Sequence, residues 1–130
     1  FIEDHLDRLW ASAQAFQLEI PETRQGIKNI VSTLIEKNQL GISAMKLMVT
    51  GGVSPNGFSP GEPTFLMMHL PFVQPDARLY TDGASLMTHA YHRDLPQVKS
   101  VAYAQALALE KEWKLKGHVD VLYFQNEFIN

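Results

Sequence analysis

The chain has 130 residues, a formal net charge of −3 at pH 7 and a pI near 5.9, so a broad basic surface for nucleic acid is not expected. It has no cysteine, which excludes disulfides, thiolate nucleophiles and cysteine-based zinc sites. A hydrophobic fraction of 45% and a charged fraction of 19% are typical of a soluble globular domain, and no apolar run is long enough to span a bilayer. We therefore expect a cytoplasmic protein that binds neither nucleic acid nor membrane.

Residues 1–70 predict two helices followed by two strands. Apolar residues recur at three- and four-residue steps over 1–16, which predicts the first helix. The same spacing recurs in a second helix that ends near residue 38, and Pro21 and Glu22 suit its first turn. Two apolar runs of strand length follow at 44–50 and 64–70. The turn residues between these runs predict a long hairpin loop.

The prolines at 71 and 75 break this pattern and mark 71–77 as an interdomain linker. Beyond it the sequence predicts strands at 79–81 and 84–91, a helix within 96–116 that ends at Gly117, and a further strand at 119–124. A helix between two apolar strands indicates an α/β layer, with the last strand beside the one before residue 93. The residues expected to face a core from the helix are Val101, Ala104, Leu107, Ala108 and Leu109.

Lys99 is the side chain that this second half singles out. Pro96 can occupy the first turn of a helix, which would place Lys99 near the positive end of the helix dipole. A cation is disfavoured there, so the position favours the neutral amine that Schiff-base chemistry needs. The alternative is an ordinary surface charge, as we expect for Lys111, Lys114 and Lys116. No metal site is expected, because His5, His89 and His92 do not share metal-ligand spacing on one face.

Three short motifs occur in an order that resembles the class IV, or fold type IV, pyridoxal-phosphate enzymes. They are HLDRL at 5–9, VTGG at 49–52, and RDLPQVKS at 93–100 with Tyr103 after it. That family includes branched-chain aminotransferases, D-amino acid aminotransferases and aminodeoxychorismate lyase. The resemblance implies an α+β or α/β architecture. In it, 1–70 is a small two-layer domain, 71–77 a linker, and 78–130 the start of a larger cofactor-binding domain.

The resemblance also implies the chemistry and the site residues. Lys99 is expected to form the Schiff base with pyridoxal 5'-phosphate and then to carry a proton, while Tyr103 contributes to cofactor binding. The loop after the first strand is expected to approach the substrate through Gly51, Gly52, Asn56 and Phe58. Asn56 and Phe58 stand where D-amino acid aminotransferases carry an arginine and a histidine, which argues against D-amino acid substrates. Arg93 is a further possible site residue, with a structural role as the alternative.

The matched region resembles the middle of a family member. A phosphate-binding arginine is expected before Phe1 and a pyridine-contacting glutamate directly after Asn130, so Glu127 is not given that role and the 130 residues alone are expected to be poorly active. The resulting prediction is an aminotransferase acting on an amino acid, branched-chain substrates being plausible, and a 2-oxo acid, as a homodimer. The alternatives are a lyase of the aminodeoxychorismate type and a non-catalytic binding module of the same fold.

Overall fold

Two helices and a β-hairpin form the first unit, Phe1–Val73, of the computed structural model, which describes residues 1–125 and 128–129. Helix α1 spans Ile2–Ala15 and helix α2 spans Arg24–Asn38. Leu6 is 1% exposed and Ile27 is 0% exposed, so each helix contributes a fully buried side chain to the core. The Thr23 hydroxyl accepts a hydrogen bond of 3.0 Å from the Gly26 N–H and caps α2. Both predicted helices are confirmed.

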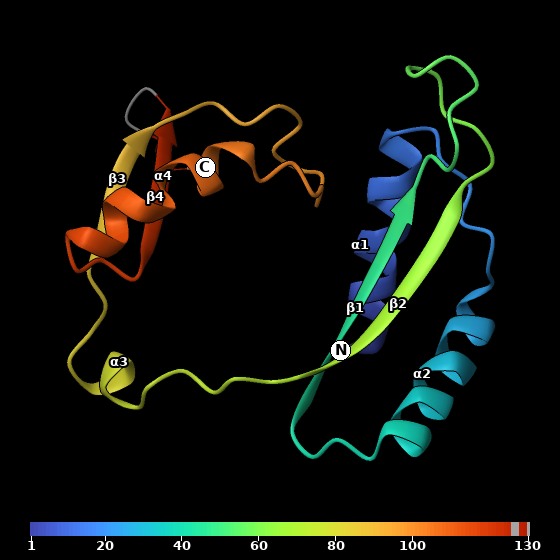
Figure 1. The fold of residues 1–130 in the computed structure, drawn as a ribbon, viewed down its shortest axis with the longest axis horizontal. Helices are drawn as coiled ribbons and strands as arrows, with labels where there is room; N and C mark the ends of the chain where they lie inside the picture. Colours follow the sequence, from blue (N-terminus) through green and yellow to red (C-terminus); the bar gives the residue numbers. More distant parts are fainter. Residues whose placement is uncertain (126–127, 130) are drawn as a thin grey trace. The chain divides into compact units, whose positions relative to one another are not determined.

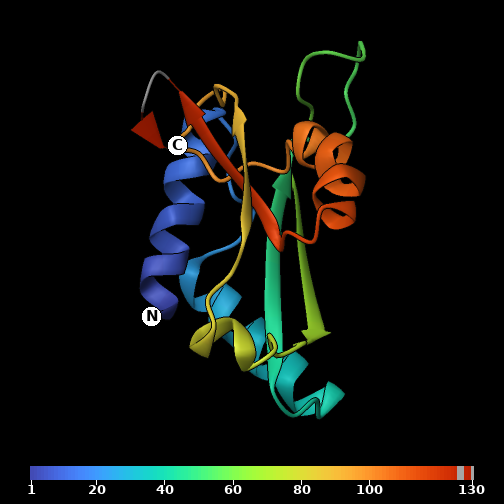
Figure 2. The same cartoon turned by 90° about the vertical axis from the view of Figure 1, so that its left-hand side faces the viewer.

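The strands β1 (Ser43–Thr50) and β2 (Thr64–Pro71) pair antiparallel along their full length. This confirms the predicted strands and hairpin. Figures 1 and 2 show α1 and α2 on the same face of this ribbon. His69 on β2 links α2 to the hairpin. Its Nδ1 lies 3.2 Å from the carbonyl oxygen of Leu34 on α2, and its Nε2 lies 2.8 Å from the hydroxyl of Ser43 on β1.

A charged cluster joins the two helices. Arg24 on α2 lies 2.6 Å from the Asp7 carboxylate and has its guanidinium carbon 4.9 Å from the centre of the Trp10 ring. Lys28 forms an ion pair with Glu3 one turn away. Exposed pairs of this kind contribute about 0 to 1 kcal/mol each, so burial of Leu6 and Ile27 dominates the packing of α1 and α2.

The second unit, Gln74–Asn130, is built around a parallel strand pair. Strand β3 (Leu86–Ala90) pairs parallel with β4 (Asp120–Gln125), and β5 (Phe128–Ile129) pairs antiparallel with β4, giving the order β3-β4-β5. Helix α4 (Ala104–Leu115) connects the parallel strands and packs on β4. The predicted neighbouring strands and the mixed α/β class are confirmed.

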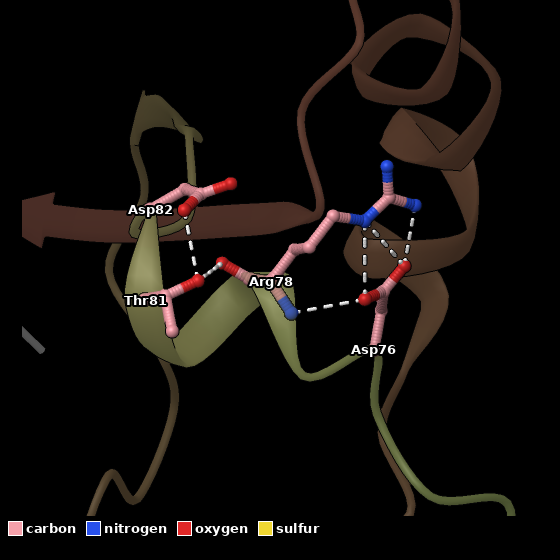
Figure 3. Close-up of polar contacts among 4 residues, drawn as sticks. All are labelled: Asp76, Arg78, Thr81 and Asp82. Atoms are coloured by element: carbon pink, nitrogen blue, oxygen red, sulfur yellow. Dashed lines mark hydrogen bonds and ion pairs between the residues drawn. The ribbon is translucent and has the colours of Figure 1, made fainter.

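The strand predicted at 79–81 is wrong, because these residues belong to a short helix, α3 (Arg78–Thr81). The Asp76 carboxylate accepts hydrogen bonds from the Arg78 backbone N–H at 2.9 Å and from its guanidinium at 2.6 Å (Figure 3). The Thr81 hydroxyl bonds both the Arg78 carbonyl and the Asp82 carboxylate. These local side-chain bonds satisfy the backbone of a single helical turn and override the apolar alternation read from the sequence.

Helix α4 begins later and packs through a different face than predicted. It starts at Ala104 rather than near Pro96. Leu107 is 67% exposed and Val101 is 65% exposed, while Leu109 and Trp113 are partly buried. Five residues were expected to face a core, and only Leu109 is partly covered. The other four are exposed: Val101, Ala104, Leu107 and Ala108. Because α4 is apolar around much of its circumference, its sequence did not define a single buried face.

Candidate active site

Lys99 lies on the loop that connects β3 to α4. The Val98 N–H donates a hydrogen bond of 2.9 Å to the Leu95 carbonyl, which closes a turn with Pro96 at its second position, the position that a fixed φ suits best. Val98 is only 2% exposed, whereas the neighbouring Lys99 is exposed. The buried Val98 therefore anchors the segment beside the exposed Lys99.

The helix-terminal environment predicted for Lys99 is wrong. The Ser100 N–H bonds the Val98 carbonyl at 3.2 Å and the Tyr103 N–H bonds the Val101 carbonyl at 2.9 Å, so the backbone from 98 to 103 follows tight turns. Tyr103 is the N-cap residue of α4, and Lys99 precedes the helix instead of lying in its first turn. The dipole argument consequently does not apply to Lys99, and the spacing of Lys99 and Tyr103 is not one helical turn.

The loop that carries Lys99 leaves the sheet at the carboxyl ends of the parallel strands. The Tyr91 N–H continues the ladder by donating to the Phe124 carbonyl at 3.1 Å, and the His92 Nδ1 makes a short hydrogen bond with the Gln125 side-chain oxygen. In α/β sheets, ligands bind outside the carboxyl ends of the strands. Lys99 thus lies on a loop that follows the carboxyl end of a strand, the end of the sheet at which such folds bind ligands.

Arg93 is half-buried at the start of this loop and points back to it. Its Nη2 donates to the Val98 carbonyl at 3.5 Å, a long hydrogen bond to the residue before Lys99. This contact favours the structural role left open for Arg93 in the sequence analysis. Tyr103, in contrast, is 49% exposed, so about half of this residue is accessible to solvent.

An aromatic cluster that the sequence analysis missed covers the α4 side of the strands. His89 and Tyr123 are register partners with ring centroids 6.3 Å apart, and Tyr91 lies 5.4 Å from Tyr123. Gln105 on α4 contacts the His89 Nε2 at 3.0 Å. The two-residue spacing of His89 and Tyr91 in a predicted strand was the signal that placed them on one face.

The Tyr123 hydroxyl is the most constrained polar group in this cluster. It is buried and makes no hydrogen bond to any residue in 1–125 or 128–129. Burial raises the pKa of Tyr123, the charges of Asp120 and Tyr91 raise this pKa further, and the positive charge of Arg93 lowers it. The phenol is therefore held in its neutral form in this environment.

The glycines of the hairpin loop allow its two sides to approach closely. Gly61 donates a backbone hydrogen bond of 2.7 Å to the Gly51 carbonyl. Gly52 has a φ of 65°, and a Cβ at this position would lie 1.7 Å from the Glu62 carbonyl oxygen. Close backbone packing therefore requires glycine at position 52. The predicted contact of Gly51 and Gly52 with substrate stays a prediction.

Asn56 and Phe58 occupy the tip of the same loop with different surroundings. The Asn56 side-chain oxygen accepts from the Phe58 N–H at 3.0 Å and from the Ser59 N–H at 2.7 Å, so this side chain organises the loop. Phe58 is 94% exposed and Val53 is 90% exposed. The loop thus presents apolar side chains on a framework held by Asn56.

The predicted site residues fall into two groups. Lys99, Tyr103 and Arg93 lie in the second unit within one stretch of chain, while Gly51, Gly52, Asn56 and Phe58 lie in the hairpin loop of the first unit. Glu127, to which no cofactor role was given, lies outside the described residues. Within the described ranges there is no group of three or more histidine, aspartate or glutamate side chains that could hold a metal ion, and no helix long and apolar enough to cross a bilayer.

Comparison with known proteins identifies the family. The sequence model described as amino-transferase class IV matches residues 1–128, and the chain therefore belongs to the class IV aminotransferase family. A provisionally named branched-chain-amino-acid aminotransferase of Methanocaldococcus jannaschii is 30% identical over 114 residues, which is 82% of this chain and 38% of that protein.

A solved structure has the same fold. A provisionally named 4-amino-4-deoxychorismate lyase of Legionella pneumophila superposes with a TM-score of 0.83 at 21% identity, over 98% of this chain and 48% of that one. This likeness establishes the fold of fold type IV pyridoxal-phosphate enzymes. The chain spans less than half the length of either protein.

Proposed function

We propose that this chain is part of a pyridoxal-phosphate-dependent aminotransferase in which Lys99 binds the cofactor covalently and moves the proton in the reaction. The observation that carries the proposal is the position of Lys99 in a chain of the class IV family. It is exposed on a turn anchored by the buried Val98, beyond the carboxyl end of β3. A 30% identical relative named as a branched-chain-amino-acid aminotransferase supports the reaction class.

The residues of the β3–α4 loop fit pyridoxal phosphate in the chemistry of their side chains. An accessible amine is needed for covalent attachment, and Lys99 provides one. Tyr103 adds a half-exposed aromatic side chain with a hydroxyl on the same stretch of chain. The cofactor, when bound, supplies the electron sink for breaking a bond at the substrate carbon. The protein's part is to hold this group in place and to deliver and remove protons.

Lys99 can serve two successive purposes because its side chain is long and its backbone is fixed. The hydrogen bond between Val98 and Leu95 sets the position of the main chain, and a lysine carries its amine on a long four-carbon stem. When not bonded to a cofactor, the Lys99 amine would be available as a general base and acid. A positioned group of this kind contributes about 10² to 10⁴ in rate.

The hairpin loop is the proposed substrate loop, with Gly51, Gly52, Asn56 and Phe58 as its contributing residues. Its support is the exposed apolar tip at Val53 and Phe58, which offers no cation for a carboxylate and suits an apolar substrate side chain. This agrees in kind with branched-chain substrates. Assembly of the enzyme as a homodimer is a further part of the proposal, which light scattering of the full-length protein tests.

Covalent labelling tests the role of Lys99 directly. The full-length protein is mixed with pyridoxal phosphate, its visible absorbance is recorded, and the linkage is reduced with borohydride before peptide mapping. We expect a visible band and a label confined to Lys99, both lost in Lys99→Ala. Lys111→Ala removes an exposed lysine of α4 and is expected to leave both unchanged. A label spread over surface lysines would contradict the proposal.

A lyase acting on aminodeoxychorismate is the second candidate, favoured by the structural likeness to the Legionella pneumophila protein. The two reactions are separated by their products. Transamination needs a 2-oxo acid acceptor and returns a new amino acid, whereas the lyase releases a product from a single substrate. Activity that persists without any 2-oxo acid would favour the lyase. A protein that shows no visible band and performs neither reaction would instead favour a non-catalytic binding module.

A further inference from the structure

The dipeptide Asn56-Gly57 at the tip of the hairpin loop has the features of a chemically reactive site. Both residues are exposed. Gly57 has a φ of 79°, and no heavy atom lies within 4 Å of the position that a Cβ would occupy. Among the described residues, the Gly57 backbone N–H has no hydrogen-bond partner. The Gly57 nitrogen thus belongs to an exposed residue and is not engaged in a hydrogen bond with any described residue.

The Asn56 side-chain carbonyl is surrounded by hydrogen-bond donors. Its Oδ1 accepts from the Ser59 N–H at 2.7 Å, the Phe58 N–H at 3.0 Å and the Ser54 hydroxyl at 3.4 Å. Donors aimed at a carbonyl oxygen stabilise the negative charge that develops there when a nucleophile adds to the carbon. The loop therefore resembles a small oxyanion hole built around an amide of its own chain.

We propose that Asn56 is a self-modification site, at which the folded loop promotes conversion of the asparagine to aspartate or isoaspartate. The Gly57 nitrogen forms a bond to the Asn56 Cγ and the proton of that nitrogen is lost. The bond from Cγ to Nδ2 then breaks, Nδ2 takes up a proton and leaves as ammonia. A cyclic imide remains, and water opens it at either carbonyl.

The neighbouring serine is placed to assist the departure of ammonia. The Asn56 Nδ2 donates to the Ser59 hydroxyl at 3.1 Å. This contact orients the nitrogen, and the same hydroxyl can turn to donate a proton once the tetrahedral carbon has formed. Ser54 holds the other side, since its hydroxyl also accepts from the Asn56 backbone N–H at 3.4 Å.

The two products have different consequences for the loop. An aspartate keeps both side-chain oxygens as acceptors for the N–H groups of Phe58 and Ser59, and its charge strengthens these bonds. An isoaspartate lengthens the backbone by a methylene group and disrupts the hydrogen bonds from the Phe58 and Ser59 N–H groups to the side chain at position 56. Either product adds a negative charge to the chain, whose formal charge is −3 before conversion.

The test compares conversion rates in folded and unfolded full-length protein. The protein is incubated at mildly alkaline pH in buffer and in denaturing urea, and the fraction of converted Asn56 is followed by peptide mass spectrometry. We expect conversion to be roughly three- to tenfold faster in the folded protein. This is below the 10² to 10³ that a buried oxyanion-hole donor contributes, because the loop is exposed. Asn29 and Asn38, in α2, serve as internal references that should stay amides.

Ser54→Ala refines the test, because it removes one donor to Oδ1 and leaves the dipeptide intact. The folded-state rate is expected to fall by about two- to fivefold, with the rate in urea unchanged. Equal or slower conversion in the folded wild-type protein would overturn the proposal, since the loop would then protect Asn56. The result does not depend on cofactor or substrate, so it is independent of the proposed function.

Discussion

The Val98 N–H and the Leu95 carbonyl form a 2.9 Å hydrogen bond, and the turn that it closes holds Leu95 at a φ of 49°. Leu95 is 43% exposed, so burial of its side chain cannot be the main reason for this left-handed conformation. Val98, at the other end of the turn, is 2% exposed and fixes the segment. The turn before Lys99 is therefore maintained by the anchor at Val98 against the backbone preference of Leu95.

The strained position at Leu95 leads to a prediction with two substitutions. Leu95→Val places a β-branched side chain in the left-handed region and is expected to lower the free energy of unfolding by about 1 to 2 kcal/mol. Leu95→Gly removes the strain and is expected to cause no loss. Urea unfolding followed by circular dichroism measures both. Equal destabilisation by valine and glycine would show that the Leu95 side chain, and not its backbone, matters.

Two loops of the first unit should respond differently to an added methyl group: the hairpin loop should not tolerate it at Gly52, whereas the connection between α2 and β1 should tolerate it at Gly41. Gly52→Ala brings a Cβ to within 1.7 Å of the Glu62 carbonyl oxygen at a positive φ, so we expect a loss of about 2 to 4 kcal/mol. Gly41→Ala is the control, because no atom lies within 4 Å of its Cβ position. The expected change there is within about 0.5 kcal/mol. Thermal unfolding of the two variants makes the comparison.

Asp76 should titrate differently when its arginine partner is removed. The hydrogen bond from the Arg78 side chain, assisted by the Arg78 backbone N–H, holds the pKa of Asp76 below its usual value of 3.8. In Arg78→Ala we expect this pKa to rise towards 3.8 but to remain slightly low, because the backbone N–H is retained. Carboxyl carbon NMR measures the shift directly. Arg8→Ala, in the first unit, should leave the Asp76 pKa unchanged.

The sign of the linked effect on stability follows from the lowered pKa. A carboxyl whose pKa is lower in the folded state stabilises the fold at pH values above its usual pKa, and this contribution is lost as the pH falls through the folded-state pKa. Wild-type protein is thus expected to lose this contribution below pH 3.8, and Arg78→Ala to have less of it to lose. Because both side chains are exposed, the difference should be small and reduced by salt.

Tyr123 should make the protein sensitive to alkali. Burial raises the pKa of Tyr123 above its usual value of 10.0, so its stabilising effect is present below pH 10.0 and is lost as the pH rises through the folded-state pKa. Tyr123→Phe removes a buried hydroxyl without a hydrogen bond among the described residues, so we expect a change in the free energy of unfolding of about 0 to 1 kcal/mol at neutral pH, in the stabilising direction.

The alkaline branch of the stability curve distinguishes this tyrosine from an exposed one. In Tyr123→Phe the decline above pH 10.0 should be shallower than in wild type. Tyr80→Phe is the matched control, since Tyr80 is 77% exposed and should not change this branch. Urea unfolding at a series of pH values provides the curves. Identical slopes in both variants would contradict the assignment to Tyr123.

The two threonines of α2 should respond in opposite ways. Thr23→Ala removes the cap on the Gly26 N–H and is expected to cost about 1 kcal/mol. Thr33→Ala replaces an exposed mid-helix threonine, whose hydroxyl bonds the Asn29 carbonyl, by the best helix former. That change is expected to be neutral or to stabilise by up to about 0.7 kcal/mol. Circular dichroism during urea unfolding reports on both.

The first unit was predicted well because its elements are specified locally. Helix periodicity places Leu6 and Ile27 on the buried faces, and turn residues separate two strands whose pairing is the simplest available. The errors lie in the second unit. Asp76 and Arg78 fold 78–81 into a helical turn through side-chain bonds. Pro96 occupies the second position of a β-turn instead of the first turn of a helix, and both positions accept proline.

The site was only partly accessible from sequence. The family and the proposed role of Lys99 came from the order of the motifs, while the surroundings of Lys99 required coordinates. Nothing in the sequence indicates that Asn56 turns its amide into the loop, because this depends on the path of the backbone from 54 to 59. Tyr123 was overlooked because a tyrosine in an apolar strand is usually a packing residue, and its unpaired hydroxyl becomes visible only with its neighbours in place.

The contrast between the hairpin pairing of β1 with β2 and the parallel pairing of β3 with β4 has a consequence for the order of folding. The hairpin closes a loop of residues 51–63, whereas β3 must wait for β4 across residues 91–119, and the longer closure is entropically more demanding. During synthesis the first unit can form once residue 73 is available, while β3 still lacks its partner. We therefore expect β3 to be the last strand of the described chain to gain protection from hydrogen exchange during refolding.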